Sequence, residues 1–171
     1  MDAEELRRIQ APLKARYKQD PASALITLRA RARVVQQSLT CVLETGKTGA
    51  PVGLHAAAGG DGLSACSGDM LLEALVGCAG VTLAAVATAM GLELRSAHVS
   101  AEAELDFRGT LGVSKEAPIG LSQIRLVFEV DTAALDKLEK LIELTERYCV
   151  VLRTLTLPPA IVVRTRPPAT A

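Results

Sequence analysis

The strongest constraint on this chain is a run of twenty residues, 71–90, with a single charged side chain, Glu73. A run of that length and composition is long enough to cross a bilayer. It is, however, rich in Ala and Gly and lacks aromatic anchors and a basic flank. We therefore predict a helix buried on all sides that ends before Gly91. Because 171 residues can hardly surround such a helix, we expect a partner subunit to cover part of it.

The composition favours one domain with neither a nucleic-acid nor a membrane partner. Lys plus Arg and Asp plus Glu both number 19, so the net charge is zero. The chain is 49% apolar but only 2% aromatic, so Ala, Leu and Val must build a closely packed core. The charged N-terminus, MDAEELRRIQ, lacks the apolar segment of a signal peptide, and we therefore expect a cytoplasmic protein.

Hydrophobic periodicity predicts an α+β chain in two parts. Residues 1–20 form a charged helical extension, and residues 21–171 form the domain. Alternating side chains predict strands at 26–36, 38–45, 94–107, 122–130 and 160–166, with a short strand near 52–55. An amphipathic helix is expected at 133–147, capped by Asp131 or Thr132, with an apolar stripe that reaches Cys149.

Two of the four cysteines, Cys78 and Cys149, fall in the two best predicted helices. The spacings of Cys41, Cys66, Cys78 and Cys149 fit neither a zinc site nor a CxxC motif, and the two histidines are isolated, so we predict no metal. If the amphipathic helix packs against the buried one, Cys149 can meet Cys78, and a disulfide becomes feasible. The alternative is two inert packed thiols, since free cysteines are often buried.

Three stretches of the chain resemble a known protein family. The stretches GLHAAAGGDG…SGDMLLEALVGCAGVTLAAVATAMGLEL, RGTLGV…APIGLSQIRLVFEVD and LIELTERYCVVLRTL are similar to the OsmC/organic hydroperoxide resistance (Ohr) family over residues 26–165. The resemblance implies an intertwined homodimer in which curved antiparallel sheets wrap two central helices. It also implies a peroxidase that uses cysteine alone, without a metal or a flavin cofactor.

By that resemblance, Cys78 is the peroxidatic thiolate of an antioxidant enzyme. It attacks the O–O bond of an organic hydroperoxide and becomes a sulfenic acid, which Cys149 resolves to a disulfide. A dithiol of the dihydrolipoyl type then reduces the pair. The apolar helix walls favour alkyl peroxides over hydrogen peroxide.

The chain departs from the family pattern around these cysteines. Asp69, nine residues before Cys78, stands where the family has an acidic residue after a proline, and it serves equally well as a helix cap. The family has an arginine that activates the peroxidatic cysteine, and the sequence motif around that arginine cannot be recognised in this chain. Arg153 lies four residues past Cys149 and either approaches its sulfur or offsets the helix dipole. Further candidates, by position only, are Arg29, Arg31 and Arg33, and Cys149-Val150 replaces the usual Cys-Pro.

Two other functions remain open from the sequence. One is a non-catalytic OsmC-like dimer that binds a small apolar ligand in its interface pockets, with an ordinary thiol at Cys78. The other is an interaction protein that engages a partner through residues 1–20. Cys66 is either an alternative resolving thiol or an ordinary loop cysteine, and Cys41 is expected in the core. The GGDG sequence at 59–62 forms a turn or binds an anion through its backbone.

Overall fold

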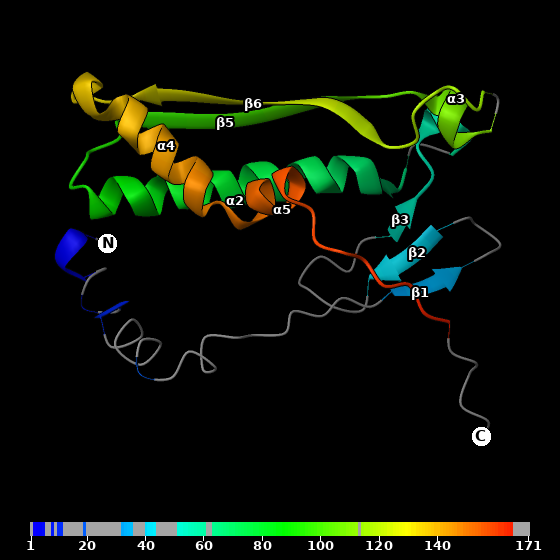
Figure 1. The fold of residues 1–171 in the computed structure, drawn as a ribbon, viewed down its shortest axis with the longest axis horizontal. Coiled ribbons are helices and arrows are strands. Elements are labelled where there is room, and N and C mark those ends of the chain that lie inside the picture. The colour runs from blue at the N-terminus through cyan, green and yellow to red at the C-terminus, as the bar shows by residue number, and fades with distance from the viewer. Residues whose placement is uncertain are drawn as a thin grey trace.

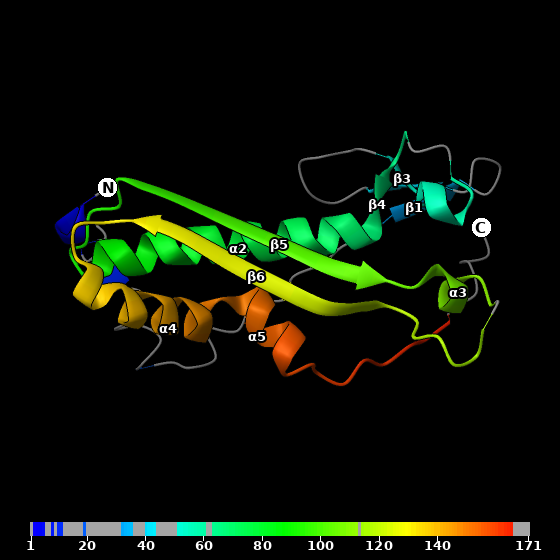
Figure 2. The same cartoon turned by 90° about the horizontal axis from the view of Figure 1, so that it is seen from above.

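The computed structural model describes residues 2–5, 8, 10, 11, 19, 32–35, 40–43, 51–60, 63–112 and 114–165, with the backbone alone for 32–35, 40–43 and Arg108. A long helix lies beneath a two-stranded hairpin, and two shorter helices lie alongside it (Figures 1 and 2). A small sheet lies beyond the N-terminal end of the long helix. Helices and strands are therefore combined as an α+β fold, as the sequence predicts.

The long helix, α2 (Ser67–Ala89), contains the predicted apolar run. Its buried positions recur every four residues, which places them on one face; they are Leu75, Ala79, Leu83 and Ala87. Around Leu83 this face packs against Leu141 and the half-buried side chains of the hairpin. Only 28% of the most apolar stretch of α2 is buried within this chain. Among the described residues, α2 is therefore covered on one face, and the expectation that a partner subunit covers the rest stays a prediction.

Gly91 ends α2, as predicted. Its φ of 67° lies in the left-handed region, which glycine enters without the steric cost of a Cβ. The N–H of Leu92 donates to the carbonyl of Ala87 at 2.9 Å, and the N–H of Gly91 donates to Thr88 at 3.1 Å. This pair of bonds is the Schellman arrangement, which satisfies carbonyls that the helix end would otherwise leave unpaired.

The predicted hairpin consists of β5 (Ser96–Leu105) and β6 (Leu121–Asp131), which pair antiparallel. The alternation along β5 is confirmed from Val99 to Leu105, where every second side chain is partly buried; Ala97, predicted to face inward, is exposed. The register shifts at Glu102/Glu104, and opposite this shift Gln123 has a positive φ of 49°. An extra residue on β6 therefore forms a bulge that bends the hairpin.

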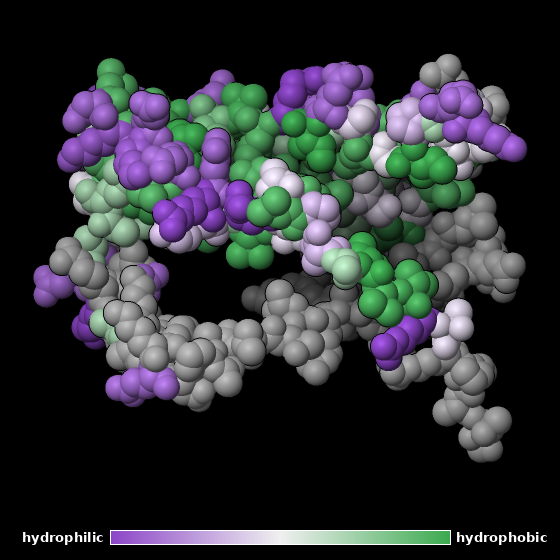
Figure 3. Space-filling model, viewed as in Figure 1, coloured by the Kyte–Doolittle hydropathy of each residue, from purple (hydrophilic) through white to green (hydrophobic). Residues whose placement is uncertain are grey.

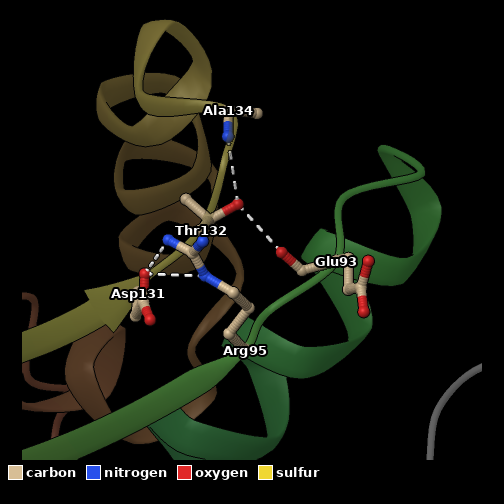
Figure 4. Close-up of polar contacts among 5 residues, drawn as sticks. All are labelled: Glu93, Arg95, Asp131, Thr132 and Ala134. Carbon is tan, nitrogen blue, oxygen red and sulfur yellow. Dashed lines mark hydrogen bonds and ion pairs between the residues drawn. The ribbon is translucent and has the colours of Figure 1, made fainter.

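Polar contacts close the open end of the hairpin (Figure 4). Arg95 pairs with Asp131 through its guanidinium, and its backbone N–H donates to the Asp131 carbonyl at 2.9 Å. The hydroxyl of Thr132, which is buried, donates to the Glu93 carbonyl at 2.8 Å and accepts from the Ala134 N–H at 3.3 Å. Thr132 thus ties the segment after α2 to the turn before the next helix, and Asp131 is used in the ion pair. Neither residue is the predicted cap, because the helical turn that follows starts after Ala134 and has no side-chain cap.

The predicted amphipathic helix is divided in two. A 3₁₀ turn, η4 (Leu135–Lys137), leads into α4 (Leu138–Tyr148), and after Cys149 a second helix, α5 (Val150–Thr156), begins. The buried stripe is confirmed at Leu141, Thr145 and Cys149. Leu135, predicted to belong to the stripe, is 70% exposed because the 3₁₀ turn has a different periodicity from the α-helix.

The four-stranded sheet has the order β1-β2-β3-β4. Its strands are β1 (Ala32–Val35), β2 (Thr40–Leu43), β3 (Pro51–Gly53) and β4 (Ala65–Cys66). The pairs β1–β2 and β2–β3 are antiparallel, but β3–β4 is parallel, so the expectation of purely antiparallel sheets is wrong at this edge. Two short helices, η3 (Ala56–Ala58) and α3 (Phe107–Thr110), lie near this end of the molecule.

The two ends of the chain differ from the prediction in different ways. Most of the expected N-terminal helix lies outside the described residues, although 3–5 are helical and the Glu5 N–H donates to Asp2 Oδ1 at 2.8 Å. A strand was predicted at 160–166, yet 160–165 pair with no strand of the described chain. Ile161, Val162 and Val163 are largely exposed there.

Candidate active site

Cys78 occupies the middle of α2 on a half-buried position. Its thiol faces the junction of α4 and α5, where it forms hydrogen bonds with Cys149 and with the backbone N–H groups of Val150 and Val151. The structure therefore brings together the two cysteines that the sequence singled out. Both are free thiols.

Cys149 lies in the break between α4 and α5. Its φ of −71° and ψ of 107° are those of extended backbone, so the helix is interrupted at this one residue. Its N–H donates to the Thr145 carbonyl at 2.9 Å, and its own carbonyl accepts from the Arg153 N–H at 2.9 Å. The side chain is fully buried. The first N–H groups of a helix have no acceptor within the helix. Because α5 begins directly after the break, its first N–H groups are available to donate to Cys78.

The surroundings of Cys78 favour its ionised form. Burial by itself would raise the pKa of this thiol, but hydrogen bonds outweigh burial and the net pKa is lowered. The donors are the Val151 N–H, the Cys149 thiol, the Val150 N–H and the Thr82 hydroxyl. Hydrogen bonds to a thiolate stabilise the charged form. Cys78 is thus the sulfur that ionises first.

The surroundings of Cys149 have the opposite effect. Burial raises its pKa, and the hydrogen bond to Cys78 and the charge that Cys78 carries when ionised raise it further, against backbone N–H groups of Leu152 and Val151 that lower it. Cys149 therefore keeps its proton while Cys78 loses one. A nucleophilic thiolate beside a protonated thiol is the pairing that two-step sulfur chemistry needs.

Thr82 is a member of the site that the sequence analysis missed. It lies one helical turn after Cys78, is half-buried, and its hydroxyl donates to the Cys78 carbonyl oxygen at 2.7 Å. When Cys78 ionises, this single hydroxyl proton can turn from the carbonyl to the thiolate, which lowers the pKa of Cys78. The spacing of four residues on one helix was a signal that could have found it. The Val150 and Val151 N–H groups had no such signal, since backbone donors leave no trace in the side-chain pattern.

Asp69 is not brought to Cys78 within this chain. It lies exposed in the first turn of α2. Nine residues of helix advance by about 13 Å and turn the side chain to about the opposite face. Asp69 instead borders a cavity of about 340 Å³ together with His55, Cys66 and Glu73.

Arg153 also lies away from the Cys78 sulfur. Its side chain is exposed and borders a cavity of about 270 Å³ between β6 and the α4–α5 pair, together with Phe128 and Glu146. It is not one of the donors named above for Cys78. The candidate arginines of the first strand, Arg29 and Arg31, lie outside the described residues, as does the side chain of Arg33. In the described part of the chain, Cys78 is activated by dipolar donors.

The remaining candidates are dispersed. Cys66 is the residue before α2, twelve residues from Cys78, which corresponds to about 18 Å along the helix axis. For Cys41 the backbone alone is described, in β2. Within the described residues, no three His, Cys, Asp or Glu side chains gather into a group that could hold a metal ion. The second half of the GGDG sequence, 61–62, lies outside the described residues.

Comparison with known proteins places this fold and this pair of cysteines in a family. A family model described as "OsmC-like protein" matches residues 59–164, which is well over half of the chain. The chain belongs to the OsmC-like family. The matched region runs from the loop before α2 through α5, and it therefore contains both Cys78 and Cys149. No curated protein sequence matches the chain.

Solved structures share the fold of this OsmC-like chain at low sequence identity. An OsmC-like protein from Mycoplasma pneumoniae has 13% identity and a TM-score of 0.63, with 78% of this chain and 89% of that one covered. An organic hydroperoxide resistance protein from Elizabethkingia anophelis has 17% identity and a TM-score of 0.58, with 73% and 84% covered. An OsmC-like protein of unknown function from Vibrio cholerae has 14% identity and a TM-score of 0.56, with 75% and 94% covered.

Proposed function

We propose that this OsmC-like protein is a thiol-dependent peroxidase that reduces organic hydroperoxides. The observation that carries the proposal is the contact of Cys78 with Cys149, in which the pKa of one thiol is lowered and the pKa of the other is raised. Family membership supports it, and so does the likeness in fold to an organic hydroperoxide resistance protein.

The proposed reaction runs in three balanced steps. The Cys78 thiolate attacks one oxygen of the O–O bond, which breaks; the alkoxide leaves, takes up a proton and departs as an alcohol, and Cys78 becomes a sulfenic acid. The Cys149 sulfur, losing its proton, then displaces hydroxide from Cys78; a disulfide forms and water leaves. A dithiol of the dihydrolipoyl type reduces the disulfide by exchange and is itself oxidised to a disulfide.

The position of Cys78 also suits the proposed substrate. Cys78 is partly accessible, so a peroxide can reach it, whereas Cys149 is fully buried and is shielded from direct oxidation. The helix around Cys78 presents Val81 and alanine side chains. Such walls favour the alkyl group of an organic hydroperoxide over hydrogen peroxide.

We further propose that the working form is a homodimer, in which a second copy covers the bare faces of α2. Val81, in the middle of α2, is 74% exposed in the single chain. Past α5, Leu157, Ile161 and Val163 are largely exposed, and Figure 3 shows green, apolar surface on the segment that follows α5. Exposed apolar surface of this extent is typical of subunit interfaces. A partner strand would also satisfy the backbone of 160–165.

The proposal is tested with purified protein, tert-butyl hydroperoxide and dihydrolipoamide. Wild type should consume peroxide, and Cys78→Ser should lose at least about a thousandfold in rate because the nucleophile is absent. Cys149→Ser should react once and stop at the sulfenic acid, which a dimedone adduct at Cys78 records by mass spectrometry. Peptide mapping of oxidised wild type should recover a Cys78–Cys149 disulfide. If wild type and Cys78→Ser consumed peroxide at equal rates, the proposal of a peroxidase that depends on Cys78 would be wrong.

A second function remains a candidate, namely a dimer that binds a small apolar ligand in its interface pockets and performs no sulfur chemistry. The positions of Asp69 and Arg153 favour this function, because both residues border cavities that Cys78 does not line. Among the described residues, neither is then a charged partner of the Cys78 thiol. Under this function, Cys78 and Cys149 would remain reduced when wild type is mixed with tert-butyl hydroperoxide. The same peptide mapping therefore separates the two functions.

A further inference from the structure

The structure holds a third, mainly apolar cavity at the N-terminal end of α2; it adjoins the cavity that Asp69 borders, since Leu54, His55 and Cys66 line both. Its volume is about 310 Å³, and its walls come from the loop after β3, the start of α2, the end of β5 and α3. Leu54, Leu105, Phe107, Ile119 and Leu121 supply most of the lining. None of the described side chains that line it is Lys, Arg, Asp or Glu.

Two close backbone contacts hold the walls in place. A Cβ on Gly60 would stand 1.8 Å from the Leu54 carbonyl oxygen, so only glycine permits that approach. A Cβ on Gly109 would stand 2.4 Å from the Pro118 carbonyl oxygen, so α3 and the segment before β6 are also in direct contact. The cavity is therefore bounded by backbone that is packed against backbone, and it is formed before any ligand arrives.

The one imidazole at the rim is also fixed. The Nδ1 atom of His55 accepts a hydrogen bond from the Ala57 N–H at 3.0 Å. The ring stacks on Phe107 with 5.0 Å between the two centroids. A histidine that accepts at Nδ1 carries a proton on Nε2, so this ring presents a single donor, the Nε2–H. The other polar groups of the lining are the Cys66 thiol and the Ser67 and Thr110 hydroxyls.

We propose that this cavity is a binding site for a small, uncharged, mainly hydrocarbon molecule. A volume near 300 Å³ is at the lower end of ligand pockets, and predominantly apolar walls with a few polar atoms are their usual composition. The absence of a charged lining side chain in the described chain disfavours ionic ligands, because their desolvation would go uncompensated. The site lies within one chain and is independent of the proposed peroxidase chemistry.

The site is tested with N-phenyl-1-naphthylamine, an uncharged probe that fluoresces in apolar surroundings. Titration of the full chain should saturate at one probe per chain. 1-Octanol should displace the probe, and octanoate, which has the same chain length and a charge, should displace it at least about tenfold less well. Better displacement by octanoate would overturn the proposal. Cys78→Ser should bind the probe as wild type does, which separates this site from the proposed enzyme function.

Substitutions at two glycines of α2 show where the probe binds. A Cβ on Gly68 would point between the Cys66 sulfur, at 3.6 Å, and Leu121, at 3.9 Å, so a larger side chain enters the cavity. A Cβ on Gly77 of the same helix would meet nothing within 4 Å. Gly68→Leu should therefore weaken probe binding at least about tenfold, and Gly77→Leu should leave it unchanged. Circular dichroism confirms that both variants are folded.

The Cys66 thiol provides an independent readout on unmodified protein. Bound probe should slow alkylation of Cys66 by iodoacetamide without slowing that of Cys78, as followed by peptide mass spectrometry. Unchanged binding in Gly68→Leu, or protection of Cys78 in place of Cys66, would show that the probe binds elsewhere and would overturn the proposal.

Discussion

Cys78 and Cys149 carry the same functional group, yet their surroundings shift the two pKa values in opposite directions. Burial raises the pKa of Cys149, and its contact with Cys78 raises it further, which outweighs the N–H groups of Leu152 and Val151 that lower it. Cys78 accepts hydrogen bonds from backbone N–H groups and from Thr82, so its pKa is lowered. Under the proposed function, this difference makes Cys78 the nucleophile. The donors to Cys78 among the described residues are dipoles, and dipoles directed at a thiolate act in the same sense as a positive charge.

Removing the Thr82 hydroxyl should make Cys78 less reactive below the midpoint of its pH profile. Only the thiolate is alkylated, and a lowered pKa keeps the thiolate populated to lower pH. Thr82→Val raises that pKa, so the midpoint of the pH–rate curve for iodoacetamide should move upward. The rate at pH 7 should fall about fivefold, which corresponds to one hydrogen bond of roughly 1 kcal/mol.

Thr82→Ser is the matched control, because it keeps the hydroxyl and should keep the wild-type midpoint. The limiting rate at high pH should be equal in all three proteins, because there Cys78 is fully ionised. A lower limiting rate in Thr82→Val with an unchanged midpoint would mean that Thr82 acts on access to the sulfur and not on its ionisation.

At the scale of elements, the break between α4 and α5 positions the site. Cys149 is extended while its neighbours on both sides are helical. Val150 is the first residue of α5, a position where the N–H has no helical acceptor and is free to donate to Cys78. The sequence lacks the proline that the family resemblance places here, but the break is present, and the helices on both sides of it contact α2.

Val150→Pro should stabilise the fold and weaken the site at the same time. Proline is favoured at the first position of a helix, and the extended conformation of Cys149 is the one that a residue before proline adopts. Unfolding should shift upward by about 1–4 °C, because proline restricts the unfolded chain by roughly 0.4–1 kcal/mol. The lost N–H should slow Cys78 alkylation at pH 7.

The control for this variant is Val150→Ala, which removes the same side chain and keeps the N–H. Its alkylation rate should match wild type, and differential scanning calorimetry gives both unfolding temperatures. If Val150→Pro unfolded at a lower temperature than Val150→Ala, the break would not be preformed in the way that the backbone angles indicate.

At the scale of the whole molecule, the chain leaves much of its longest helix uncovered. The hairpin and α4 cover one face of α2, and α5 lies against part of it, as Figures 1 and 2 show. The composition and length of this helix would also suit a membrane span. Within the OsmC-like fold, however, α2 is the helix on which the hairpin packs, and a second copy is the proposed cover for the rest.

Val81→Asp should convert the proposed dimer to a monomer at low micromolar concentration, as measured by light scattering after size exclusion. A charge at a residue that is 74% exposed would change the stability of a lone chain by no more than about 0.5 kcal/mol. In an interface, the same charge would be buried without a partner. Leu135→Asp, at 70% exposure away from α2, is the control and should leave the size unchanged. A wild-type monomer would contradict the proposal of a dimer.

The fold class, α2, the hairpin and the buried stripe of α4 could be predicted from the sequence, because each leaves a periodic pattern of apolar side chains along the chain. Gly91 could be predicted as the helix end, because the left-handed conformation needs glycine. The same reasoning from the local side-chain pattern gave a wrong prediction of a strand for residues 160–165, because a strand forms only where another strand accepts its hydrogen bonds.

By itself, the sequence determined that two cysteines lie on two apolar helical faces and that one helix is too apolar to be left bare. Only the tertiary structure decided that Cys149 sits in a helix break, that the N–H groups of Val150 and Val151 point at Cys78, and that Asp69 and Arg153 lie elsewhere. The physical reason is that periodicity encodes which face of an element is buried. The direction of a backbone donor and the distance between two elements depend on how those faces are packed together.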